Sequence, residues 1–198
     1  MVVSFSKAGI SGASTISFNP ETSKYTIKFG SETIETTVTD KAAIVDQWIQ
    51  DIKVPHPPNS SVIIGLDVER SSSTSSIGRK KPATLHLCID DKCLILQLIY
   101  IDSLPLSLKN FLKNPNYFFV GFEADSLINS VANVYGLGFG VHADVKEIAM
   151  EESPHPSSSK LALKDLAMAF FGLSNWENRV LSIEQVEYGT IDAYVSYK

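Results

Sequence analysis

The segment Ser61–Glu69 (SVIIGLDVE) constrains the fold more than any other part of the chain. It is a dense apolar run, as expected of a β-strand that other elements cover on both faces. Asp67 and Glu69 are two residues apart at its carboxyl end, and the two-residue period of a strand puts both side chains on one face. The run therefore predicts a central strand that carries a pair of acids.

The residues after this strand predict an α/β core in the order βββαβαβ, followed by further helices. The first three strands form an antiparallel meander, with a turn at 90–92 between the second and the third. Ser182, with Gln185 three residues later, marks the start of the last helix as a capping box. The expected elements are strands 83–89, 93–100, 117–121 and 140–143, and helices 104–112, 124–135, from 145, 161–171 and from 182 to the end. The residues expected to face inward on helix 124–135 are Leu127, Ile128, Val131, Val134 and Tyr135.

Residues 1–58 read differently from the rest of the chain. Strands are expected at 14–19, 24–29 and 33–38, followed by a helix that Asp40 caps and that runs to Ile52. The apolar face of that helix comprises Ile44, Val45, Trp48, Ile49 and Ile52. The predicted domains are residues 1–58, a β segment and helix packed on the core, and residues 59–198, the α/β domain.

Composition and charge exclude several classes of protein. Apolar residues make up 44% and charged residues 20%, so the chain is expected to fold rather than remain disordered. Its apolar stretches are far shorter than the roughly 20 residues that cross a bilayer. The amino terminus lacks the pattern of a signal peptide, so we expect a cytoplasmic protein without membrane contact, with a nuclear location as the alternative. Seventeen basic against 22 acidic residues give a net charge of −5, which disfavours a broad basic face for duplex DNA but leaves room for a narrow nucleic-acid cleft.

The two cysteines, Cys88 and Cys93, flank the 90–92 turn, so a hairpin there brings them near each other. In an intracellular protein we expect them to be reduced, buried thiols. They do not make a metal site by themselves, because no second Cys pair or His pair completes four ligands.

Further acids are expected at the same edge of the sheet as Asp67 and Glu69. Asp125 lies in the first turn of the helix that follows strand 117–121, where strand ends of an α/β sheet converge. Tyr188 and Asp192 are four residues apart on the last helix and share a face. Each signal has a simpler interpretation when taken alone. Asp67 and Glu69 can be a solvated strand end, Asp125 can cap its helix, and the spacing of Tyr188 and Asp192 can arise by chance. Together they favour a divalent cation, which offsets the repulsion between carboxylates and gains oxygen ligands.

Three segments in order resemble the exonuclease motifs of the DnaQ-like superfamily, in the DEDDy subclass that has Tyr in the third motif. They are Asp67–Glu69, Val120–Asp125 and Tyr188–Tyr194. Their flanks resemble the Werner-syndrome-type exonuclease domain at Leu85–Cys88, Leu163–Leu166 and Ser174–Trp176. The resemblance covers about residues 61–198 and, with three motifs in order, is fairly specific.

The resemblance implies an RNase H-like fold with two Mg²⁺ or Mn²⁺ ions. By position, Asp67, Glu69 and Asp192 would ligate the ion that activates water, and Asp67 would bridge to the second ion. Asp125 would hold that second ion, partly through water, and Tyr188 would orient the attacking water. Such a site hydrolyses phosphodiester bonds from the 3′ end and releases nucleoside 5′-monophosphates.

The chain departs from the family pattern near the first motif. Arg70 stands where an aromatic or hydrophobic residue is common, and His86 stands where a Gln is often found; we expect these changes to affect substrate grip rather than the metal site. The stretch Ser71–Ser76 is expected to be a flexible surface loop.

Other polar and aromatic residues near the motifs have weaker signals. The basic residues Arg79, Lys80 and Lys81 are candidate contacts to substrate phosphates. His142 and His155 have no obvious partners and are taken as ordinary surface or loop residues, and Trp176 is taken as a packing residue.

The leading prediction is a metal-dependent 3′→5′ exonuclease on single-stranded nucleic acid, with RNA favoured over DNA. Size and layout resemble the plant RISC-interacting clearing exoribonucleases, which act on Argonaute-connected RNA and form rings. We therefore expect a homo-oligomer, of which a hexameric ring is one form. Two alternatives stay open: a DNA repair or proofreading exonuclease, and a catalytically silent interaction module.

Overall fold

A computed structural model of the chain describes residues 5–6, 15–53, 61–74, 80–145 and 173–198. In these ranges nine strands form one sheet, in the order β1-β2-β3-β4-β7-β6-β5-β8-β9. The strands are β1 (Phe5–Ser6), β2 (Thr15–Asn19), β3 (Lys24–Phe29), β4 (Glu32–Thr39), β5 (Val62–Thr74), β6 (Lys80–Ile89), β7 (Lys92–Gln97), β8 (Tyr117–Gly121) and β9 (Val141–Asp144). The helices are α1 (Ala42–Lys53), α2 (Leu106–Leu112), α3 (Ala124–Tyr135) and α6 (Ile183–Tyr197).

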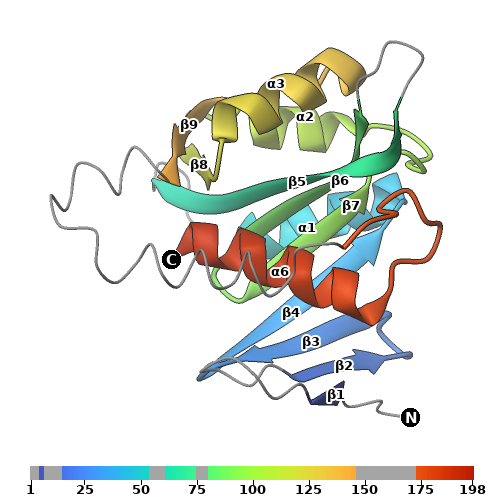
Figure 1. Cartoon of the computed structure of the whole chain (residues 1–198). Helices are drawn as coiled ribbons and strands as arrows, with labels where there is room; N and C mark the ends of the chain where they lie inside the picture. The colour runs from blue at the N-terminus through green and yellow to red at the C-terminus, as the bar shows by residue number, and fades with distance from the viewer. Residues whose placement is uncertain (1–4, 7–14, 54–60, 75–79, 146–172) are drawn as a thin grey trace, which may run out of the picture.

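The sheet is mixed, and its pattern confirms the predicted fold class. Strands β5, β6 and β7 pair antiparallel, whereas β8 and β9 run parallel to β5. The amino-terminal strands β1 to β4 are antiparallel to one another, and β4 then pairs parallel with β7. The amino-terminal meander thus extends the central sheet, as the blue strands below β7 in Figure 1 show.

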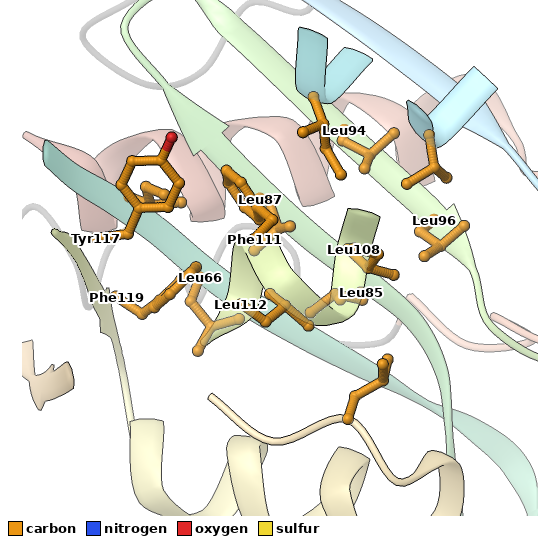
Figure 2. Packing of buried hydrophobic residues seen from close by; sticks show 14 of the residues in the cluster. Leu66, Leu85, Leu87, Leu94, Leu96, Leu108, Phe111, Leu112, Tyr117 and Phe119 are labelled. Carbon is orange, nitrogen blue, oxygen red and sulfur yellow. The ribbon is translucent and has the colours of Figure 1, made fainter. Parts of the chain in front are cut away.

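Helices cover both faces of the central strands, which explains why β5 is apolar along most of its length. Residues of α1, α2 and α3 pack with one face, and Figure 2 shows Leu108, Phe111 and Leu112 of α2 among the leucines of β5, β6 and β7. Helix α6 covers the other face, together with Trp176 and Leu181 (Figure 1).

Helix α6 lies unusually close to β5 because of a glycine. A Cβ atom at Gly65 would lie only 1.9 Å from the carbonyl oxygen of Ala193, so no side chain fits between the strand and the helix there. The amino end of α6 begins at the predicted capping box, in which Ser182 and Gln185 each bond the other's backbone N–H. Sequence-local capping and close packing together fix where α6 lies on the sheet.

Several expectations were wrong in detail. Ile44 and Val134 are 44% and 46% exposed, because each lies at the edge of the buried stripe of its helix rather than at its centre. Residues 71–74 belong to β5, since the strand continues past a bulge at Glu69 and Arg70 instead of ending in a loop. Cys88 and Cys93 are joined by a disulfide, because they lie directly opposite each other on β6 and β7 with Cα atoms 4.2 Å apart.

Some expectations fall outside the described ranges. These are helix 161–171, the helix from 145 beyond its first residue, the end of the serine-rich stretch, Arg79 and His155. Within the described ranges, no helix is both long enough and apolar enough to span a membrane.

Candidate active site

The first two acids are positioned by the alternation of β5. Ile64, Leu66 and Val68 point into the core shared with α1, α2 and α3, so Asp67 and Glu69 point to the opposite face, where α6 lies. Asp67 is opposite His86 on β6, and Glu69 is opposite Thr84. The predicted placement of both carboxylates on one face therefore agrees with the observed register.

Helix α6 brings the residues of the third segment to the same place. Tyr188 and Asp192 lie one turn apart, and the Tyr188 hydroxyl donates a hydrogen bond to the Asp192 carboxylate. Asp192 and the two acids of β5 are close enough to act electrostatically on one another. Strand β5 and helix α6 thus converge on one group of four residues, here called the acidic cluster: Asp67, Glu69, Tyr188 and Asp192.

The acidic cluster is electrostatically strained when no cation is present. Burial raises the pKa of Glu69 to about 8, and the negative charges of Asp67 and Asp192 add to this effect, while the Arg70 backbone N–H opposes it. Burial also raises the pKa of Asp192 to about 7, with a further contribution from Asp67 and an opposing one from the Tyr188 hydroxyl. Burial and the three carboxylates raise the pKa of Tyr188, so this side chain stays a neutral hydroxyl that can donate a hydrogen bond.

These properties fit a hard divalent cation. Carboxylate oxygens are its preferred ligands, and its charge would relieve the mutual repulsion that raises the acids' pKa values. The buried Oδ2 atom of Asp67 accepts no hydrogen bond, although His86 Nδ1 lies 3.0 Å away, so it keeps lone pairs available for an ion. In the described part of the chain no group of three or more His, Cys, Asp or Glu side chains is arranged to hold a metal ion.

Asp125 is much more exposed than Asp67, whose side chain is 15% exposed. It is in the first turn of α3, directly after β8, as predicted, and its side chain is 81% exposed. The charges that act on Glu69 are those of Asp67 and Asp192, and Asp125 does not contribute. A role for Asp125 at a second ion stays a prediction.

His142 is a partner of Asp125 that the sequence did not reveal. Its Nε2 atom lies 2.8 Å from Asp125 Oδ1, and its Nδ1 atom lies 3.0 Å from the carbonyl oxygen of Gly140. The expectation of an unpartnered surface histidine was therefore wrong. Since β9 runs beside β8, the residues that end β9 lie next to the start of α3, and this adjacency was the available signal.

The two departures from the family pattern both lie at the site. The Arg70 guanidinium lies 3.4 Å from the hydroxyl of Ser126 and so links the end of β5 to the first turn of α3. His86 is fully buried, with Nδ1 3.0 Å from Asp67 Oδ2, so it lies against the acidic cluster. The expectation that this change spares the metal site stays a prediction. Trp176 is buried against the rings of His86 and Tyr188, which confirms its packing role.

The candidate phosphate contacts lie at the start of β6. Lys80 and Lys81 are exposed, and Lys80 pairs with Thr74 beyond the bulge in β5. They therefore flank the strand that carries Asp67 and Glu69 and are open to a bound strand of nucleic acid. Their contact with substrate stays a prediction.

Comparisons with known proteins agree with this architecture. No protein-family model matches the chain. A curated Arabidopsis thaliana protein described as a 3′-5′ exonuclease is 25% identical over 170 residues, which is 81% of this chain, and the chain spans 58% of that relative's length. The exonuclease domain of Nibbler from Aedes aegypti superposes with a TM-score of 0.60 at 14% identity, over 81% of this chain and 83% of that domain. The EXD2 exonuclease domain soaked in Mg and GMP superposes with a TM-score of 0.52 at 21% identity, over 81% of this chain and 85% of that domain.

The fold is that of these exonuclease domains. The EXD2 domain has also been soaked in Mn together with Mg, and it superposes on this chain with a TM-score of 0.51. At these identities the structural likeness concerns the fold. The chemistry of this chain must therefore be argued from its own side chains.

Proposed function

We propose that this protein is a metal-dependent 3′→5′ exonuclease that shortens single-stranded nucleic acid, RNA in preference to DNA. The observation that carries the proposal is the acidic cluster, in which β5 and α6 bring Asp67, Glu69 and Asp192 together with the Tyr188 hydroxyl. A buried set of mutually repelling carboxylates is costly for a fold, and it is useful where it binds cations. The Arabidopsis relative and the exonuclease domains of similar fold support this reading.

Each residue of the site has a proposed role. Asp67, Glu69 and Asp192 would hold one Mg²⁺ or Mn²⁺ ion, and Asp67 together with Asp125 would hold a second. Bound there, the two ions would clamp the attacking and leaving oxygens of an in-line displacement at phosphorus. The neutral Tyr188 hydroxyl orients the attacking water, and the products are nucleoside 5′-monophosphates.

We also propose the finer assignment to the DEDDy subclass and a role on Argonaute-associated RNA fragments. Tyr188 at the position of the third-motif tyrosine supports the first. Size and an amino-terminal β segment, which extends the sheet through β4, support the second. Lys80 and Lys81 offer charges to the phosphates of the entering strand.

The decisive experiment uses end-labelled RNA and DNA oligonucleotides of one sequence, each blocked in turn at the 3′ or the 5′ end. With Mg²⁺ we expect stepwise shortening from a free 3′ end, faster on RNA, and no reaction in excess chelator. A block at the 3′ end should stop the reaction, whereas a block at the 5′ end should not.

The same experiment separates the alternatives. Faster shortening of DNA would favour a repair or proofreading enzyme. Binding of oligonucleotides without shortening, in the presence of Mg²⁺ or Mn²⁺, would favour an interaction module. Activity that survives Asp67→Ala would remove the acidic cluster from the mechanism.

A further inference from the structure

His86 is in contact with the acidic cluster from inside the sheet. It lies on β6 directly opposite Asp67, and its side chain is 1% exposed. Its Nδ1 atom is 3.0 Å from Asp67 Oδ2, and its Nε2 atom is 2.8 Å from the hydroxyl oxygen of Thr84. The Nε2 atom thus shares a hydrogen bond with Thr84, whereas the Nδ1 atom faces the Asp67 carboxylate at ion-pair distance without a hydrogen bond.

The same imidazole ring packs directly against α6 at Gly189. A Cβ atom at Gly189 would lie 2.5 Å from Cε1 of His86 and 2.8 Å from its Nδ1 atom. No side chain other than hydrogen fits at position 189 while the ring is in place. Gly189 follows Tyr188 directly and precedes Asp192 by three residues, so the ring packs against α6 between two residues of the acidic cluster.

The His86 ring also packs against Trp176. The centroid of the Trp176 ring lies 5.4 Å from that of His86 and 6.1 Å from that of Tyr188. Both His86 and Trp176 are buried, so the imidazole has neighbours on β5, β6, α6 and the segment before α6. Such confinement leaves the ring few alternative orientations.

We infer that His86 is a positioning residue for the acidic cluster, paired with Gly189, and that it orients Asp67 and sets the spacing of the β5 and α6 acids for cation binding. This inference rests on the proposed function. Carboxylates that bind metals are generally oriented by such neighbours, and loss of one typically costs 10-fold to 100-fold in metal affinity. The chemistry at stake is therefore the affinity and geometry of the cation site, and not proton transfer by His86.

The test measures Mn²⁺ binding by calorimetry on full-length protein, together with the thermal unfolding midpoint. His86→Leu keeps the approximate volume but removes both nitrogens, and we expect Mn²⁺ affinity to fall about 10-fold to 100-fold. His86→Gln, which retains an amide donor, should recover part of this loss. Wild-type Mn²⁺ affinity in both variants would overturn the inference.

The pairing with Gly189 gives an independent test. Gly189→Ala alone should weaken Mn²⁺ binding, because the added methyl group forces α6 and the ring apart. In the His86→Ala background the same change should have a much smaller effect, because the space is already free. Equal effects of Gly189→Ala in both backgrounds would overturn the inference, and His86→Gln can replace His86→Ala if the latter does not fold.

Asp67→Ala distinguishes failure of this inference from failure of the proposed function. If Asp67→Ala abolishes Mn²⁺ binding while the His86 and Gly189 variants bind normally, only the positioning role is wrong. If Asp67→Ala itself binds Mn²⁺ as the wild type does, the proposed cation site is wrong and the positioning role falls with it.

Discussion

The hydroxyl group of Tyr188 has a proposed role in orienting water, and no role in binding the cation. The hydroxyl is neutral and bonded to Asp192, so it can orient a water molecule without supplying a ligand charge. Tyr188→Phe should slow turnover about 10-fold to 1,000-fold and leave Mn²⁺ affinity nearly unchanged. The measurement is single-turnover cleavage beside calorimetric titration, with Tyr197→Phe as control, since that tyrosine bonds Asp90 at the far end of α6. Loss of Mn²⁺ binding in Tyr188→Phe would contradict the assigned role.

Asp67 is the acid on which the site depends most, because its charge acts on Glu69, Asp192 and Tyr188. Asp67→Ala should reduce activity at least about 1,000-fold, which corresponds to about 4 kcal/mol of transition-state stabilisation. The fold should survive, because the substitution relieves repulsion between buried carboxylates. Cleavage assays and thermal unfolding test the two halves of this expectation. If Asp67→Ala is both inactive and unfolded, the loss of activity follows from loss of the fold, and the expectation that the fold survives is wrong.

At the scale of elements, the approach of α6 to β5 holds the two halves of the site together. Gly65→Ala puts a methyl group where the Ala193 carbonyl oxygen now lies, so α6 must move outward. We expect a loss of about 1–3 kcal/mol in the free energy of unfolding, or more, together with weaker Mn²⁺ binding. Gly138→Ala is the matched control, because its new methyl would meet only the flexible end of Lys113, at 3.3 Å. Denaturant unfolding with equal losses in both variants would contradict the close-packing argument.

The elements also show which features of the site a sequence can predict. The alternation of β5 and the one-turn spacing of Tyr188 and Asp192 are local patterns, and both appear in the structure as predicted. The contact of His86 with Asp67 depends on the register of β5 against β6, which a bulge at Glu69 and Arg70 shifts. No local pattern encodes that register, so the sequence did not show that His86, interpreted as a change in substrate grip, lies against Asp67.

The same limit applies where distant segments meet. His142 reaches Asp125 because β9 pairs beside β8. Which residues lie at the border of the buried face of α1 and of α3 depends on how each helix is rotated on the sheet. The disulfide follows from two cysteines directly opposite on a hairpin, whereas the expectation of thiols followed from the supposed compartment. Composition says little about a contact between distant segments, the rotation of a helix or the pairing of two cysteines, because these depend on how the elements pack.

For the whole molecule, the raised pKa values make stability depend on pH and on cations. Glu69 and Asp192 have folded-state pKa values of about 8 and about 7, above their ordinary values near 4. Between about pH 4 and pH 8 the folded protein therefore holds protons that the unfolded chain has released, so the free energy of unfolding falls as pH rises and levels off above that window. In chelator, the unfolding midpoint should be several degrees lower at pH 8 than at pH 5.5, and Mg²⁺ should stabilise more at the higher pH.

A double control tests that assignment. Glu69→Gln and Asp192→Asn each remove one titrating group, so each should flatten the dependence of the unfolding midpoint on pH in chelator. An unchanged slope in both variants would mean that other groups cause the dependence.

The proposed working form is an oligomer, because one chain offers little attraction to a polyanion. The net charge is −5, and in the described ranges the Lys and Arg residues of β5 and β6 are Arg70, Lys80 and Lys81. Among the described residues β1 is the outermost strand at this end of the sheet and pairs with two residues of β2. A sheet edge invites pairing with another chain. A ring built in this way would bring basic residues of a neighbouring subunit beside each acidic cluster.

Sedimentation should therefore give a mass several times 21.7 kDa at micromolar concentration. Ser17→Lys places a charge on β2, one residue past the part that pairs with β1. It should shift the mass toward the monomer and weaken RNA cleavage, because neighbouring edges would repel. Thr22→Lys, in the exposed turn after β2, adds the same charge off the strand and should leave both properties unchanged. A wild-type monomer with full nuclease activity would refute the composite site, and it would leave the roles of Asp67, Glu69 and Asp192 in cation binding intact.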